Sequence, residues 1–146
     1  LALRNLLRAS MRYRLPLFPL PVVLLPGTPM PLHVFEPRYR QMVAHCLETD
    51  RRFGLLYHDP DRSGPFEMDP GRIGCIAEIR EFQPLPDGRS LVEVQGHERF
   101  RLVDGIESGT LYYQGLVERY EDEEEDPGEV PPDPEDLRPP GRQQRL

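Results

Sequence analysis

Lysine and tryptophan are both missing from this sequence of 146 residues, whose 18 strongly basic side chains are all arginine. A Walker A loop holds nucleotide phosphates with a lysine. Ser–Lys catalysis and Schiff-base chemistry also depend on a lysine amine. The residues of this sequence therefore cannot carry out any of these activities.

Cysteine is scarce, and no long hydrophobic run is present. Cys46 and Cys75 are too few for a disulfide framework, which favours two buried free thiols in a reducing compartment. No run approaches the roughly 20 apolar residues of a membrane span. Arg4 and Arg8 interrupt the leucine-rich start and spoil a signal-peptide core. We therefore expect a cytoplasmic protein without a membrane segment, and Met11 is a candidate alternative start.

The negative charge is confined to the C-terminal end. Residues 1–120 hold 15 arginines and 15 carboxylates, whereas residues 121–146 hold 3 arginines and 10 carboxylates. A neutral body without a basic stripe argues against nucleic acid as a partner, because phosphate contacts supply most of that affinity. Six prolines also fall in the acidic end, and we predict residues 122–146 to be a disordered acidic tail.

Prolines also punctuate the segment 15–35, where they exclude a helix and predict short extended pieces. Pro37 suits the first turn of a helix, and we predict a helix over 37–49. Its apolar residues recur at helical spacing and form one stripe, predicted to be buried: Tyr39, Met42, Val43, Cys46 and Leu47.

The rest of the body has strand patterns separated by turns. Residues 59–71 form a long loop, Asp87-Gly88 indicates a hairpin, and Gly96 marks a bulge or bend. We predict strands over 53–58, 73–83, 90–95, 98–103 and 110–120. With a single helix, this pattern predicts a mainly β fold: an antiparallel or mixed barrel, closed or partly open, of six to seven short strands with one packed α-helix.

No residues have the spacing of a catalytic or metal site. The four histidines form no H-x-x-x-H pair, and no Cys-x-x-Cys is present. The serines lie in the terminus, loops or a turn and have no nucleophile elbow. Cys46 follows His45, but adjacent residues of a helix point about 100° apart. We therefore expect no catalytic residue, no metal and no cofactor, which leaves a binding module.

Four blocks in order carry a resemblance: LPLFPLPVVLLPG, PLHVFEPRYR, the LPDG hairpin and GHERFRL. Together they resemble the Lon N-terminal domain family, the substrate-recognition region of the Lon protease, in its stand-alone bacterial type. The resemblance covers about 15–121. It implies a PUA-like β-barrel with one helix that contacts unfolded or tagged protein segments, with a link to protein quality control.

The resemblance also sets expectations for domains and function. We predict an N-terminal extension over 1–14, the barrel over 15–121 and the tail over 122–146. No ATPase or Ser–Lys protease domain is expected, and therefore no enzyme. The predicted function is the binding of unfolded or flexible protein segments, or of a protein partner. The alternatives are a regulatory protein-interaction domain and a PUA-like RNA-binding barrel. The sequence does not indicate an oligomeric state.

The expected binding surface lies at a sheet edge within 26–36. Pro29 and Pro31 deny the backbone two donors, which predicts an edge strand. Met30, Leu32 and Phe35 lie on the same segment, and flexible or aromatic side chains at an edge suit apolar recognition.

Phe82, at the neck of the predicted hairpin, is expected to line the same groove. The candidate substrate-binding residues are therefore Met30, Leu32, Phe35 and Phe82. An alternative stays open, in which Leu32 and Phe35 fill the core below the helix.

Overall fold

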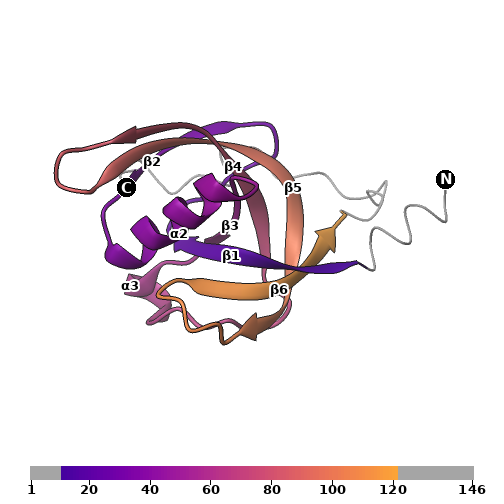
Figure 1. The fold of residues 1–146 in the computed structure, drawn as a ribbon. Helices are drawn as coiled ribbons and strands as arrows, with labels where there is room; N and C mark the ends of the chain where they lie inside the picture. Colours follow the sequence, from indigo (N-terminus) through magenta and orange to yellow (C-terminus); the bar gives the residue numbers. More distant parts are fainter. Residues whose placement is uncertain (1–10, 122–146) are drawn as a thin grey trace.

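The structure is a computed structural model that describes residues 11–121; the first ten residues and the predicted tail lie outside the described residues. Figure 1 shows a sheet wrapped into a barrel with one main helix against it. The elements are β1 (Arg12–Leu20), β2 (Pro29–Val34), α2 (Pro37–Glu48), β3 (Arg52–Tyr57), α3 (Pro60–Ser63), β4 (Ile73–Pro84), β5 (Ser90–Ile106) and β6 (Tyr113–Tyr120). The first strand begins three residues before the predicted barrel domain.

Five of the six strands close a barrel. The sheet order is β2-β5-β4-β3-β1-β6, and β6 pairs back with β5. β1 and β3 run parallel, and all other neighbours run antiparallel. This mixed barrel with one packed helix confirms the predicted fold class. α3, a single turn of four residues, lies in the segment predicted to be a loop.

β5 is one strand of 17 residues, so the prediction of separate strands over 90–95 and 98–103 is wrong. Its first half pairs with β2 and its second half with β6, while β4 pairs along both halves. The predicted irregularity at Gly96 is present as a shift of register: Cys75 pairs with Arg99, but Ala77 pairs with Gly96. β5 therefore continues to Ile106, beyond the predicted strand end at residue 103, and β6 begins only at Tyr113 instead of residue 110.

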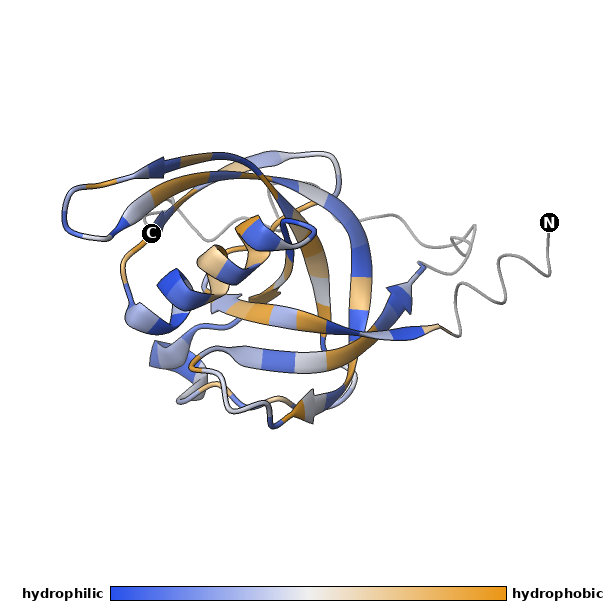
Figure 2. Cartoon of the chain, in the orientation of Figure 1, coloured by the Kyte–Doolittle hydropathy of each residue, from blue (hydrophilic) through white to orange (hydrophobic). Residues whose placement is uncertain are grey.

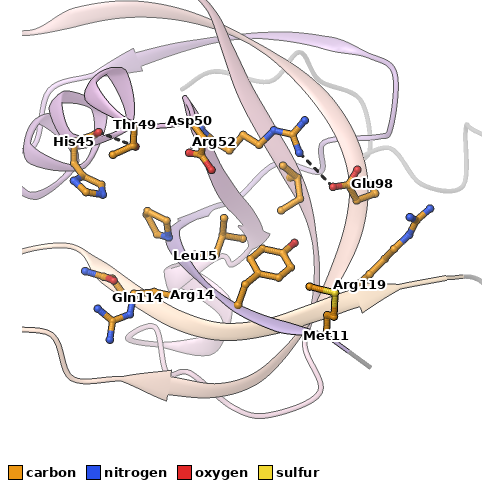
Figure 3. Close-up of a pocket in the computed structure, with 13 residues that line it drawn as sticks. Met11, Arg14, Leu15, His45, Thr49, Asp50, Arg52, Glu98, Gln114 and Arg119 are labelled. Carbon is orange, nitrogen blue, oxygen red and sulfur yellow. Dashed lines mark hydrogen bonds and ion pairs between the residues drawn. The ribbon is translucent and has the colours of Figure 1, made fainter. Parts of the chain in front are cut away.

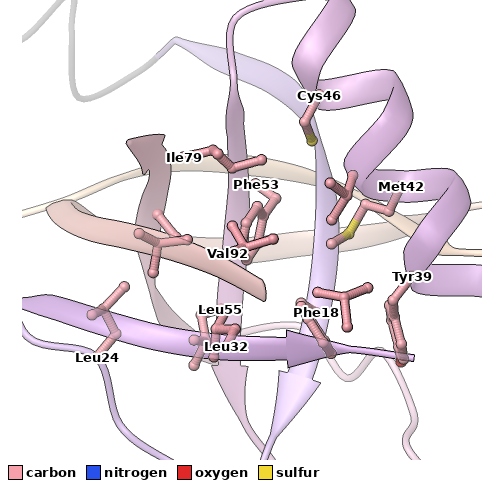
Figure 4. Close-up of a cluster of buried hydrophobic side chains, with 14 of the residues drawn as sticks. Phe18, Leu24, Leu32, Tyr39, Met42, Cys46, Phe53, Leu55, Ile79 and Val92 are labelled. Atoms are coloured by element: carbon pink, nitrogen blue, oxygen red, sulfur yellow. The ribbon is translucent and has the colours of Figure 1, made fainter. Parts of the chain in front are cut away.

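Two apolar clusters hold the fold together. Apolar and polar residues alternate along the strands in Figure 2, as expected for strands with one buried face. The smaller cluster fills the barrel around Phe100. The larger cluster lies between α2 and the sheet, where Tyr39, Met42 and Cys46 point from the helix toward Phe53 and Val92 (Figure 4).

The helix α2 begins as predicted at Pro37 and buries the predicted stripe with one exception. Tyr39, Met42, Val43 and Cys46 are buried, whereas Leu47 is only half-buried at the edge of the larger cluster. Leu47, in the last turn of α2, packs only against the edge of the larger cluster and stays partly in water.

We predict that Met42→Ala lowers the free energy of unfolding by about 2–5 kcal/mol, because Met42 is fully buried between helix and sheet. Leu47→Ala, which also truncates a large side chain on α2, is expected to cost less than half as much. Urea unfolding followed by circular dichroism measures both. Equal losses would show that the two side chains are buried alike.

Gly96 is predicted to tolerate no side chain, because its Cβ would overlap the backbone carbonyl oxygen of Leu25. Gly115 gives a matched control, since its Cβ would meet the ends of two leucine side chains, 2.6 Å and 2.8 Å away, and a backbone oxygen only at the ordinary contact distance of 3.5 Å. Gly96→Ala should cost at least about 2 kcal/mol and Gly115→Ala clearly less. A thermal melt in which Gly115→Ala is the less stable variant would contradict this.

Candidate functional site

A pocket of about 390 Å³ opens between the ends of β1 and β2, the start of α2 and the α3 turn. Five aromatic residues from five different parts of the chain line it, and we call it the aromatic groove: Phe18, Phe35, Tyr39, Phe66 and Tyr113. Three prolines also line it: Pro19 in β1, Pro21 directly after β1, and Pro60 at the start of α3. The groove is therefore apolar and comes from segments far apart in the sequence.

The floor of the groove is part of the core. Phe18 stacks on Tyr39 with ring centroids 4.1 Å apart, and both rings are buried. Leu32 lies beside them and is also buried. Burial raises the pKa of Tyr39 above its ordinary range, so its hydroxyl stays neutral at any physiological pH. The floor is rigid and uncharged.

One wall is built by the loop after β3. His58 is buried at the end of that strand; its backbone N–H donates to Leu20, and its Nε2 lies 2.8 Å from the carbonyl oxygen of Gly64. Phe66 packs its ring edge against His58 and against Tyr113, with centroids 5.4 Å and 4.8 Å apart. These contacts hold Phe66 in place although it lies in a loop.

Two arginines that do not line the groove contact two of its rings. The guanidinium of Arg72 lies 4.9 Å from the centre of the Phe66 ring. It also donates a hydrogen bond of 2.6 Å to the carbonyl oxygen of Tyr57. Arg38 donates to the hydroxyl of Tyr113 at 3.1 Å. A planar guanidinium can stack and donate at the same time, which an ammonium group cannot do as well.

The charged side chains that line the groove are carboxylates: Glu36, Asp59 and Asp61. Asp59 accepts a hydrogen bond from the backbone of Asp61 and caps the α3 turn. Glu36 precedes α2 and makes no side-chain cap. His33 also lines the groove, and its buried Nε2 has no hydrogen-bond partner among residues 11–121.

The structure separates the four predicted site residues. Phe35 lines the aromatic groove with its side chain half-exposed, and Leu32 forms part of the floor from within the core. Met30 is half-buried against the larger cluster and lines no described pocket. Phe82 is exposed on β4, opposite Val92, which in turn pairs with Leu32. Leu32 therefore links Phe82 to the groove through one row of the sheet.

Phe82 lines a different and more open hollow on the outer part of the hairpin, with a volume of about 610 Å³. We call it the hairpin hollow. Its apolar lining includes Phe82, Leu91 and the two prolines of β2, and it contains one aromatic ring besides His33. Glu81 and Glu93 lie opposite each other there, as cross-strand neighbours of β4 and β5.

A third pocket, of about 500 Å³, is lined by apolar, polar and charged side chains together (Figure 3). Arg52 lies 3.4 Å from Glu98 across it, and the backbone N–H of Arg52 donates to Asp50. Arg119 forms an ion pair of 3.4 Å with Glu121. Arginines and carboxylates are thus mixed in its wall, with one ion pair between two lining residues, Arg52 and Glu98. No group of three or more metal-ligating side chains occurs in the described part of the chain.

Both cysteines are buried free thiols. Cys46 faces the carbonyl oxygen of Arg52 at 3.4 Å, and Cys75 faces that of His97 at 3.4 Å. Burial raises the pKa of Cys46 to about 12 and that of Cys75 to about 11. A thiol with such a pKa is a poor nucleophile at neutral pH, because the thiolate is the reactive form.

The comparison with known families identifies the fold. Residues 14–138 match the profile of the ATP-dependent protease La (LON) substrate-binding domain. The chain belongs to this family. The LON match runs beyond residue 121, the predicted end of the barrel. The LON substrate-binding domain is a non-catalytic module.

Known LON proteins agree with this assignment. A LON peptidase N-terminal domain and RING finger protein of Schizosaccharomyces pombe is 36% identical over 120 residues, 74% of this chain and 24% of its own. Cereblon of Danio rerio is 34% identical over 94 residues, which cover 62% of this chain and 21% of its own. This chain therefore spans a quarter or less of these two relatives.

A crystal structure of a Lon N-terminal domain protein from Xanthomonas campestris superposes with a TM-score of 0.61 at 32% identity. The match covers 78% of this chain and 63% of that one.

Neither helix in residues 11–121 has the length and apolarity needed to cross a membrane.

Sequence reasoning missed most of the groove. Phe66 lies in a loop and Tyr113 begins β6, so neither belongs to a pattern shared with Phe35. The one available signal was the length of the 59–71 segment, since long loops in small domains often carry function.

We predict that native protein at pH 8 reacts with iodoacetamide at least about a hundredfold more slowly than protein unfolded in urea, because the folded thiols are buried and stay protonated. Raising the pH from 7 to 9 should strongly increase the alkylation rate of the unfolded protein, while the alkylation rate of the native protein should stay low. Mass spectrometry follows both sites. Rapid alkylation of either native thiol would contradict the buried, protonated state.

Proposed function

We propose that this domain binds unfolded or flexible protein segments without chemistry of its own, as part of cytoplasmic protein quality control. The aromatic groove is the surface that receives their apolar side chains. The single observation that carries this proposal is the groove itself, in which a half-exposed Phe35 and four further aromatic residues line one pocket of a LON substrate-binding domain.

The size of the groove fits this role. Small-molecule and side-chain sites have volumes of about 300–1,000 Å³ and apolar walls with a few polar groups. A groove of about 390 Å³ can take one or two large apolar side chains. Each one that leaves water contributes roughly 25 cal/mol per Å² of buried apolar surface. Such a site binds many sequences weakly, as recognition of unfolded chains requires.

The edge of the sheet supports side-chain recognition over strand addition. β2 is the end strand of the sheet order, and Pro29 and Pro31 supply no backbone N–H there. A peptide that added a strand to this edge would lack two donors. The prolines therefore leave apolar side chains as the main means by which a flexible segment can be held.

The chain offers a matched pair of variants to test the surface. Phe35 and Phe82 are 49% and 40% exposed, so either can be changed to serine with a similar small effect on stability. Phe35→Ser should weaken binding of fluorescein-labelled, reduced and carboxymethylated lactalbumin about tenfold, measured by fluorescence anisotropy. Phe82→Ser should leave the Kd within about twofold.

Thermal melts serve as the control that both variants are folded. A loss in Phe82→Ser alone would move the binding surface to the hairpin hollow, and no loss in either would place it on another face. If native, disulfide-bonded lactalbumin binds as tightly as the unfolded form, the domain does not distinguish unfolded chains and the proposed function is wrong.

A further inference from the structure

We propose that the aromatic groove selects segments in which a large apolar residue lies beside an arginine or lysine. This inference rests on the proposed function and names the class of substrate. It is argued from the charges at the mouth of the groove, because the aromatic floor and walls by themselves would accept any apolar side chain.

The mouth of the groove is acidic. Glu36, just before α2, and Asp59 and Asp61, at the α3 turn, come from two separate segments of the chain, and all three line the pocket. Glu36 and Asp61 are exposed, and Asp59 is half-buried. An apolar side chain inserted into the groove brings its sequence neighbours near these carboxylates.

Arg38, Arg40 and Arg72 all lie near the groove, and Arg40 donates to the carbonyl oxygen of Phe35 at 3.1 Å, but none of the three lines the pocket. Arg72 is bound to the Phe66 ring and to backbone carbonyls, and it does not line the groove. Arg38 holds Tyr113 and lies 3.8 Å from Glu36, with both charged side chains about half in water. Exposed pairs of this kind contribute little, so a cation from the ligand can compete for Glu36.

His33, which lines both the groove and the hairpin hollow, offers a polar contact that suits a peptide. The buried Nε2 of His33 has no hydrogen-bond partner among the described residues. A buried polar atom without a partner is costly, and a ligand group that supplies the partner gains that energy on binding. Peptide N–H and C=O groups offer both a donor and an acceptor, so either tautomer of the ring can be satisfied.

The hairpin hollow provides the matched control for charge. Glu81 and Glu93 are exposed there, beside Phe82, and neither lines the groove, although Leu32 and His33 line both hollows. Glu81→Gln with Glu93→Gln therefore removes as many charges as Glu36→Gln with Asp61→Asn. The acidic residues 121–126 remain in both double variants, so their general attraction for cations is the same.

The test uses short fluorescein-labelled peptides in a Gly-Ser background. One carries Arg-Phe-Leu-Arg, one carries Glu-Phe-Leu-Glu, and one carries Arg-Ser-Ser-Arg. The first should bind the full chain at least about tenfold more tightly than either of the others. Glu36→Gln with Asp61→Asn should reduce its affinity about three- to tenfold, and the hairpin pair should change it less than twofold. Raising the salt concentration should shrink the advantage of the arginines.

The outcomes separate this inference from the proposed function. If the arginine and glutamate peptides bind equally while Phe35→Ser still weakens both, the groove binds apolar segments without regard to charge, and only this inference is overturned. Equal losses in the two double variants would also overturn it. If Phe35→Ser changes neither peptide binding nor lactalbumin binding, the groove is not the site and the proposed function fails as well.

Discussion

The crossing of the 21–28 loop over β5 at Gly96 is the contact on which the rest of the fold depends. Gly96 accepts a hydrogen bond from Gly27 at 2.9 Å and donates one to Thr28 at 2.8 Å, so the loop lies directly on the strand. A side chain at this position would overlap the backbone of Leu25. This is also the point at which β5 leaves β2 and pairs with β6. The crossing thus divides the sheet into a closed barrel and a three-stranded extension.

The same crossing places the groove. The loop takes the chain from the end of β1 across β5 and returns it along β2, so the last residues of β1 and of β2 meet again beside α2. Phe18 and Phe35 line the groove from these two strand ends. The remaining wall comes from the loop after β3. Because β3 pairs in parallel with β1, the two strands end at the same side of the barrel. The groove is a consequence of strand order.

The elements that depend on local pattern could be predicted from the sequence. Pro37 and the apolar stripe after it specify α2, and the single helix among strand patterns specifies a mainly β fold. Interactions between distant residues could not be predicted in this way. Gly96 reads as a break between strands, but it supports one long strand because a loop needs close access to its backbone. Phe66 and Tyr113 are 47 positions apart in the sequence, and only the fold brings their rings to 4.8 Å.

The predicted site residues show why alternation along a strand does not settle burial. Leu32 and Phe82 share one row with Val92 and therefore share one face of the sheet. Leu32 is buried and Phe82 is not, because the larger cluster under α2 includes Leu32 and Val92 but ends before Phe82. Which member of such a row is core depends on the reach of a helix that packs across the strands. That reach is a property of the assembled fold.

The groove combines a fixed floor with an exposed rim, and this division suits the recognition of many segments. Phe18, Leu32 and Tyr39 are held by the core, so binding requires little ordering of the floor, which lowers the cost of association. Phe35 and the carboxylates lie at the surface and can adjust to different neighbours of the inserted side chain. In the proposed mode of binding, the floor sets the size of the apolar residue and the rim selects its sequence neighbours. Because floor and core are the same residues, a change that loosens the packing of α2 must also change the shape of the site.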